Sequence, residues 1–222
     1  MGTIVALTNS KGGVGKSTIA VHLAAWCHQQ GRRMALVDAD AQGASSVWLH
    51  EAVPDLAISR LQTPDEILDQ VPRLAAQSDV LVVDGPAGLS EVTRAILLVT
   101  HLALLPCGPS VLDLQAVQEA IRVVHQAQRI RGGPPQAVLV PNKLQVQYRL
   151  TQELLTTVPT LGVPVLGGLR LRQAFADAAG QGTLVWRLGP RGSAATEELL
   201  RLFEELNLND DETHHESGVA RE

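Results

Sequence analysis

The chain has 222 residues, of which 45% are hydrophobic, 18% are charged and only 3% are aromatic. This composition is that of one globular domain that can bury a core of Leu, Val, Ile and Ala. The sequence contains no run of about 20 apolar residues, so we expect no membrane-spanning segment. The two cysteines, Cys27 and Cys107, are too few for a disulfide framework, so we expect buried free thiols and an intracellular protein.

The net charge of −5 is unevenly distributed along the chain. Residues 1–113 carry 7 basic and 11 acidic side chains, residues 114–203 carry 10 and 5, and residues 204–222 carry 1 and 7. A basic C-terminal half is compatible with nucleic-acid binding, and a solvated arginine-rich face is the alternative. Because residues 208–222 are acidic and lack periodicity, we predict a disordered tail after a domain spanning residues 1–207.

Short apolar runs alternate with helical patterns along the chain, which predicts a single α/β domain: a mostly parallel, twisted sheet with helices on both faces. In chain order, strands are expected at residues 3–8, 33–40, 79–85, 101–107, 136–142 and 163–168. Helices are expected at residues 16–30, 64–76, 90–99, 111–131, 147–157, 170–179 and 193–207.

The segment TNSKGGVGKST, residues 8–18, joins the first strand to the first helix. It departs from the strict phosphate-binding pattern Gly-x4-Gly-Lys-Ser/Thr, because Ser10 stands where the first Gly is expected. Its glycines still leave backbone N–H groups free to surround phosphate oxygens at a helix N-terminus. Lys16 is placed to reach the β- and γ-phosphates, and Ser17 to offer its hydroxyl to Mg²⁺. The predicted ATP-binding loop comprises Lys11, Gly12, Gly13, Val14, Gly15, Lys16, Ser17 and Thr18.

Acidic residues stand at the carboxyl ends of two further strands, which is the edge where open α/β sheets bind ligands. Asp84 follows four apolar residues, as a Mg²⁺-holding acid does. Asp38 and Asp40 lie two apart and would share a face of an extended strand end. We therefore predict a Mg²⁺ site, although a lone strand-end Asp is more often a turn former or a helix cap. Its residues are Ser17, Asp38, Asp40 and Asp84.

Lys11 is surplus within one subunit, since Lys16 already serves the phosphates of its own chain. A lysine at the edge of the loop can reach a γ-phosphate held by a two-fold-related subunit and act like an arginine finger supplied in trans. The second lysine therefore predicts a homodimer with nucleotide between its halves.

Five segments resemble motifs of the ParA/MinD group of ATPases. KGGVGKST (11–18) resembles the deviant Walker A box, DADAQGASS (38–46) the second box, and VVDGPAG (82–88) the Walker B segment. PCGPSVLDL (106–114) and LRLRQAFADAAGQGTLV (169–185) are similar to later segments of small ParA proteins. The second box departs from the group's usual sequence, which has Pro where this chain has Ala.

This resemblance, over roughly residues 3–205, implies a P-loop NTPase closest to the short ParA partition and positioning ATPases, including the carboxysome-positioning McdA type. It implies ATP and Mg²⁺ as cofactors, an ATP-sandwich homodimer, and nonspecific binding of double-stranded DNA by the ATP form. It further implies a cytoplasmic, nucleoid-associated protein that hydrolyses ATP to ADP and phosphate when a cargo-bound ParB-like or McdB-like adaptor stimulates it. The cargo, whether plasmid, chromosome or protein assembly, is left open.

The resemblance also assigns roles to single residues. It ties Asp40, with Lys16, to hydrolysis, Lys11 to the contact across the subunits, and Asn142 to adenine, although an Asn there is equally a turn residue. For each predicted DNA-contacting arginine a surface ion pair is the alternative. The first two match the group's basic segment and the others are neighbours: Arg170, Arg172, Arg187, Arg191 and Arg201.

Two alternatives within the same fold stay open. A MinD-like membrane-associated ATPase needs a basic amphipathic helix at its C-terminus, and this chain has an acidic stretch there instead. A metabolic ATP-dependent synthetase is the other, since fold alone does not decide function. Lys11 and the GPSVLD segment favour the ParA interpretation, which has no membrane partner.

Overall fold

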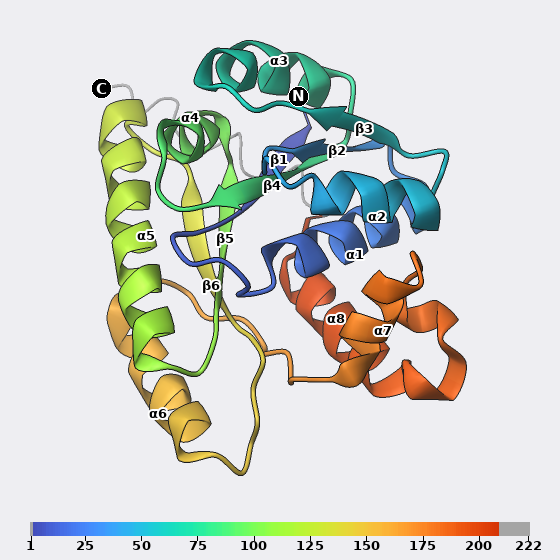
Figure 1. Ribbon diagram of the computed structural model, residues 1–222. Coiled ribbons are helices and arrows are strands. Elements are labelled where there is room, and N and C mark those ends of the chain that lie inside the picture. Colours follow the sequence, from blue (N-terminus) through green and yellow to red (C-terminus); the bar gives the residue numbers. More distant parts are fainter. Residues whose placement is uncertain (1, 209–222) are drawn as a thin grey trace, which may run out of the picture.

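The computed structural model describes residues 2–208, which form one sheet of order β3-β2-β4-β1-β5-β6 with every neighbouring pair parallel (Figure 1). The strands are β1 (Thr3–Asn9), β2 (Met34–Asp38), β3 (Ala57–Arg60), β4 (Val80–Ala87), β5 (Leu102–Cys107) and β6 (Gln136–Pro141). The α-helices are α1 (Lys16–Gln29), α2 (Ala44–Ala52), α3 (Pro64–Ala76), α4 (Glu91–Val99), α5 (Val111–Arg131), α6 (Arg149–Thr157), α7 (Gln173–Gly180) and α8 (Ser193–Glu205). The predicted parallel α/β fold is confirmed. Of the predicted tail, 209–222 lie outside the described residues.

Helices cover both faces of the sheet, as its apolar strands require. Along β1, Val5 and Leu7 face a core shared with α1, α2, α7 and α8, whereas Ile4 and Ala6 face a core shared with α3 and α4. A third core joins β5 and β6 to α5 and α6. Both cysteines are free and buried in these cores, as predicted.

Two predicted elements differ from the structure, and two further elements were not predicted. Residues 163–168 form no strand, because Pro164 lacks an N–H group and Val165 makes only an isolated bridge to Leu139. Two elements escaped prediction: β3, a short edge strand with an exposed, non-alternating burial pattern, and α2, which follows a left-handed Gly43. Helix α7 begins only at Gln173, and the residues before it are extended.

The carboxyl ends of the central strands bring the predicted site together. Asp38 pairs in register with Asp84 across β2 and β4. β1 lies on the other side of β4 and leads through the 8–18 loop into α1, whose N-terminus therefore lies at the same edge. This edge is where an open α/β sheet binds its ligands.

Candidate nucleotide and metal site

The 8–18 loop presents the uncapped N-terminus of α1. No side chain caps this helix; its N-cap residue is Gly15, in the left-handed conformation with φ 99°. A Cβ at Gly15 would lie 2.1 Å from Asn142 Nδ2, so the position requires glycine for both its conformation and its space. The first backbone N–H groups of α1 consequently remain available to an anion.

Side chains preceding the glycines anchor the loop to its surroundings. Asn9 is buried, donates from Nδ2 to the Pro106 carbonyl at 2.7 Å and accepts the Lys11 N–H at 2.9 Å. The Ser10 hydroxyl donates to the Ala116 carbonyl in α5 at 3.1 Å. The departure from the strict Gly pattern thus ties the loop to α5. Sequence reasoning missed Asn9, because its partner is 97 residues away.

Lys16 is buried within the loop and donates from Nζ to the Lys11 carbonyl at 3.3 Å. Burial lowers the pKa of its ammonium group, and the nearby carboxylates of Asp84 and Asp40 oppose this shift. Asp84 and Asp40 therefore lie close enough to Lys16 to affect its pKa.

Asp84 is fully buried, and both of its carboxylate oxygens lack a hydrogen-bond partner among the described residues. Burial raises its pKa to about 6, against the opposing influence of the Ser17 and Ser45 hydroxyls. The two hydroxyls lie near Asp84 without forming a full hydrogen bond, and a buried carboxylate in such a setting is costly unless a cation compensates its charge. Asp84 beside Ser17 therefore fits a hard divalent cation such as Mg²⁺, whose ligands are oxygen atoms.

Asp38 and Asp40 differ in their burial and in their hydrogen bonds. Strand β2 ends at Asp38, which is fully buried and accepts backbone N–H groups on both carboxylate oxygens: Asp40 at 3.1 Å and Ser46 at 2.8 Å. Asp38 thereby fixes the turn into α2. Asp40 is half-buried in that turn and accepts the Gln42 N–H at 2.9 Å. Asp40 is thus the more accessible of the two acids.

Lys11 forms an ion pair within its own chain, with Nζ 2.8 Å from Asp113 Oδ1. The Lys11 side chain is 38% exposed and that of Asp113 is 11% exposed. Asp113 lies in the first turn of α5 and also accepts a hydrogen bond from Ser110, the N-cap residue. The GPSVLD segment, which ends at Asp113, was singled out in the sequence, but the pairing of Asp113 with Lys11 was not predicted.

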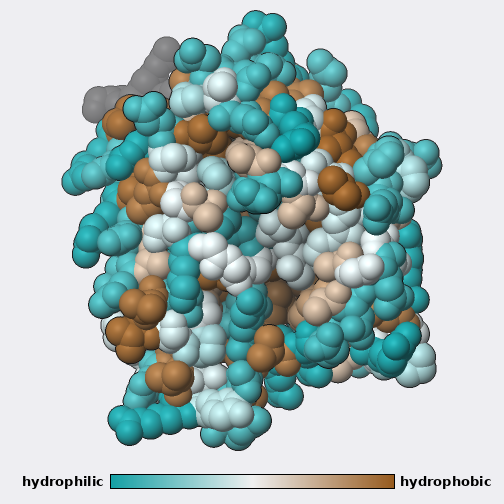
Figure 2. Space-filling model, in the orientation of Figure 1, coloured by the Kyte–Doolittle hydropathy of each residue, from teal (hydrophilic) through white to brown (hydrophobic). Residues whose placement is uncertain are grey.

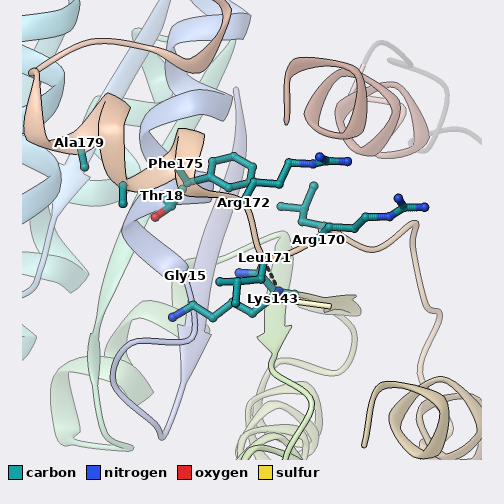
Figure 3. Close-up of a pocket in the computed structure, with 11 residues that line it drawn as sticks. Gly15, Thr18, Lys143, Arg170, Leu171, Arg172, Phe175 and Ala179 are labelled. Atoms are coloured by element: carbon teal, nitrogen blue, oxygen red, sulfur yellow. Dashed lines mark hydrogen bonds between the residues drawn. The ribbon is translucent and has the colours of Figure 1, made fainter. Parts of the chain in front are cut away.

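Asn142 braces the loop from β6. Its Nδ2 donates to the Val14 carbonyl at 2.7 Å and its Oδ1 accepts the Lys143 N–H at 2.8 Å. Asn142 also lines a pocket of about 240 Å³ beside the start of α1 (Figure 3). The other lining residues come from the loop, α1, the 169–172 segment and α7: Gly15, Thr18, Lys143, Leu169, Arg170, Leu171, Arg172, Phe175, Ala176 and Ala179.

The five predicted DNA-contacting arginines have different surroundings. Arg172 pairs with Glu198 at 2.7 Å, and Arg187 donates to the Ala52 carbonyl at 2.6 Å, so both make internal contacts. Arg170 lies 3.6 Å from Glu198, and Arg201 makes an exposed helical pair with Glu197. Among residues 2–208, Arg191 has no protein partner for its guanidinium group.

The part of the chain that the structure describes contains no helix able to cross a membrane and no cluster of three or more His, Cys, Asp or Glu that could hold a metal ion. Exposed apolar residues occur at the start of α5, which the Lys11–Asp113 pair joins to the 8–18 loop, and on α6. Figure 2 shows apolar side chains over the lower ends of α5 and α6, two helices that expose Val111, Leu112, Leu150 and Leu155.

Comparison with known proteins agrees with this arrangement. The model of the CobQ/CobB/MinD/ParA nucleotide binding domain matches residues 5–185. The chain is 34% identical over 209 residues to maintenance of carboxysome distribution protein A from Halothiobacillus neapolitanus, covering 91% of this chain and 95% of that relative. It shares its fold with apo McdA from Cyanothece (TM-score 0.79, 12% identity, 92% and 99% covered) and with the cell division ATPase MinD from Pyrococcus furiosus (TM-score 0.76, 20% identity, 93% and 99% covered). The chain therefore belongs to the CobQ/CobB/MinD/ParA nucleotide-binding domain family.

Proposed function

We propose that the protein is a ParA-type positioning ATPase whose ATP-bound homodimer binds nonspecific DNA and whose hydrolysis is stimulated by an adaptor on its cargo. The observation that carries the proposal is the buried, unpartnered Asp84 beside a loop that holds two lysines. We assign the first of these lysines, Lys11, to the nucleotide of the partner subunit. Similarity to a carboxysome-distribution protein favours a protein assembly as the cargo.

ATP binding is assigned to the loop and the start of α1. The backbone N–H groups from Gly12 to Thr18 would hold the phosphates, and Lys16 would neutralise their charge. Ser17 and Asp84 would hold Mg²⁺, which supplies charge neutralisation on the phosphate oxygens. Asp40, the accessible acid, would orient the attacking water, and Asp38 would keep Asp40 in place through the turn.

Dimerisation is assigned to the face that carries Lys11. For Lys11 to reach a partner's nucleotide it must leave Asp113, 2.8 Å away. When the γ-phosphate is present, Lys11 exchanges the Asp113 carboxylate for a more highly charged anion, and this exchange is favourable. The exposed apolar residues at the start of α5, Val111 and Leu112, would add buried area beside this contact.

DNA binding is assigned to cationic groups that are exposed and free to move. Arg191 has no protein partner among the described residues, and Arg170 and Arg201 make only long or exposed pairs. Dimerisation doubles the number of phosphate contacts and so steepens the salt dependence of binding. Arg172 and Arg187 are weaker candidates, because their internal contacts must be broken first.

The test is binding to random-sequence duplex DNA at several salt concentrations, with ATP or ADP, alongside the molar mass by light scattering. We expect the wild type to bind DNA as a dimer only with ATP. Lys11→Ala should lose both properties, whereas Arg73→Ala, which removes an exposed helical pair on α3, should lose neither. ATP binding with no DNA binding in any state would overturn the positioning function; anionic vesicles and carboxylate substrates would then test the membrane and synthetase alternatives.

A further inference from the structure

Glu198 of α8 holds the extended segment that precedes α7. Its Oε1 lies 2.7 Å from Arg172 Nη2, and its Oε2 accepts from Arg172 Nε at 3.1 Å and from the Arg170 backbone N–H at 3.0 Å. Only 11% of the Glu198 side chain and 27% of the Arg172 side chain are exposed. This two-point pairing is the geometry in which Arg and a carboxylate bind most specifically.

The opposite side of the same segment faces the nucleotide loop. Its backbone is paired to the strand extension after β6, with Leu169 N–H donating to Pro141, and Leu171 N–H donating to Leu144, both at 2.9 Å. Side chains alternate along an extended segment, so Arg170 and Arg172 point one way and Leu171 the other. Figure 3 shows the two guanidinium groups directed away from Gly15 and Lys143.

The pocket that this segment borders is apolar on one side and continuous with the phosphate loop on the other. Leu171 is 54% exposed, and with Phe175 it gives the pocket an apolar wall; Thr18 of α1 also lines this pocket. An apolar wall suits an aromatic ring held by dispersion. A one-residue slip of the segment would turn Leu171 away from the pocket and replace it with an arginine.

We infer that Glu198 and Arg172 are positioning residues that fix the wall against which the base of the nucleotide rests. This inference rests on the proposed nucleotide binding at the loop. It reassigns Arg172, predicted from the sequence to contact DNA, to the nucleotide pocket. Burial alone would raise the pKa of Glu198, but hydrogen bonds from Arg172 and from the Arg170 backbone N–H outweigh it, so the pKa is lowered and the carboxylate stays charged.

The experiment compares a ligand that has a base with one that lacks it. Calorimetry measures the Kd of ADP and of inorganic tripolyphosphate, both with Mg²⁺. We expect Glu198→Gln to raise the Kd of ADP by about tenfold. The Kd of tripolyphosphate should stay within about twofold of the wild-type value. The matched control is Glu153→Gln on α6, whose partner Arg149 is exposed; it should change neither Kd.

A second variant keeps the test decisive if Glu198→Gln does not fold. Leu171→Ala alters an exposed side chain, and it should also raise the Kd of ADP without changing the Kd of tripolyphosphate. Unchanged ADP affinity in both variants, or equal loss of both ligands, would overturn the inference. So would an Arg172→Gln protein that loses DNA binding but keeps its ADP affinity. A wild type that binds neither ligand would instead overturn the proposed function.

Discussion

Lys11 Nζ lies 2.8 Å from Asp113 Oδ1, so the lysine proposed to act on a second subunit is held by an acid of its own. Asp113 is itself fixed by Ser110 at the start of α5. The pair therefore connects the phosphate loop to a helix that begins with exposed apolar residues. The proposed release of Lys11 and the proposed dimer surface therefore lie at the same end of α5.

Asp113→Asn should favour the dimer, because it removes the charge that retains Lys11 but keeps an acceptor for Ser110. The lysine is more than one-third exposed, so each pair contributes about 1 kcal/mol. A symmetric dimer releases two such pairs, so we expect about 30-fold tighter ATP-dependent dimerisation. Sedimentation with ATP measures this, with Glu153→Gln on α6 as the control for loss of an exposed pair. Weaker dimerisation would show that Asp113 serves the dimer rather than the monomer.

Asp38→Ala and Asp40→Ala should fail in different ways. Removing Asp38 leaves two backbone N–H groups without their acceptor. At about 1–3 kcal/mol for each loss, we expect about 2–6 kcal/mol of destabilisation. Asp40→Ala should cost less than about 1 kcal/mol yet slow ATP hydrolysis by about 100-fold. Urea unfolding and phosphate release measure the two effects. Equal unfolding free energies would contradict the structural role given to Asp38.

The sequence predicted the sheet and the loop because these depend on local pattern. Five of the six strands are apolar runs that lie in the interior, and the loop is marked by its glycines. Strand β3 was missed because a short edge strand has little burial to impose a pattern. At the site, Ser10 and Asp113 became interpretable only with α5 in place, because no local signal connects residues about 100 positions apart. Asp38 and Arg172 could likewise not be interpreted from the sequence alone. Their partners, the Ser46 N–H group for Asp38 and Glu198 for Arg172, are set by how α2 and α8 pack.

Asp84→Asn should stabilise the nucleotide-free protein while abolishing hydrolysis. The pKa of Asp84 is raised from 3.8 to about 6, so its contribution to stability is present below pH 3.8 and is lost as the pH rises through 6. At 1.36 kcal/mol per pKa unit, the buried charge costs about 3 kcal/mol at pH 7. We therefore expect a higher urea midpoint for Asp84→Asn at pH 7 without Mg²⁺. A lower midpoint would mean that the carboxylate has a stabilising partner in the free protein.

His22 should make the protein less stable in acid, whereas Asp84 makes it less stable as the pH rises. Its Nδ1 lies 2.7 Å from the Thr18 carbonyl and its Nε2 accepts the Val185 N–H at 3.2 Å, an arrangement open only to the neutral ring. The ring is enclosed by Trp48, Phe175 and Trp186. Burial lowers its pKa from 6.5 to about 4, against the opposing hydrogen bond to Thr18.

The stability that His22 contributes is therefore complete above pH 6.5 and is lost as the pH falls through 4, by about 3 kcal/mol in total. This window overlaps that of Asp84, whose slope is opposite, so the wild type should show a shallow dependence. Urea unfolding of Asp84→Asn between pH 7 and 4 isolates the slope of His22. Adding His22→Gln to the Asp84→Asn variant should flatten the dependence of its unfolding free energy on pH. An unchanged slope would assign the acid sensitivity to another group.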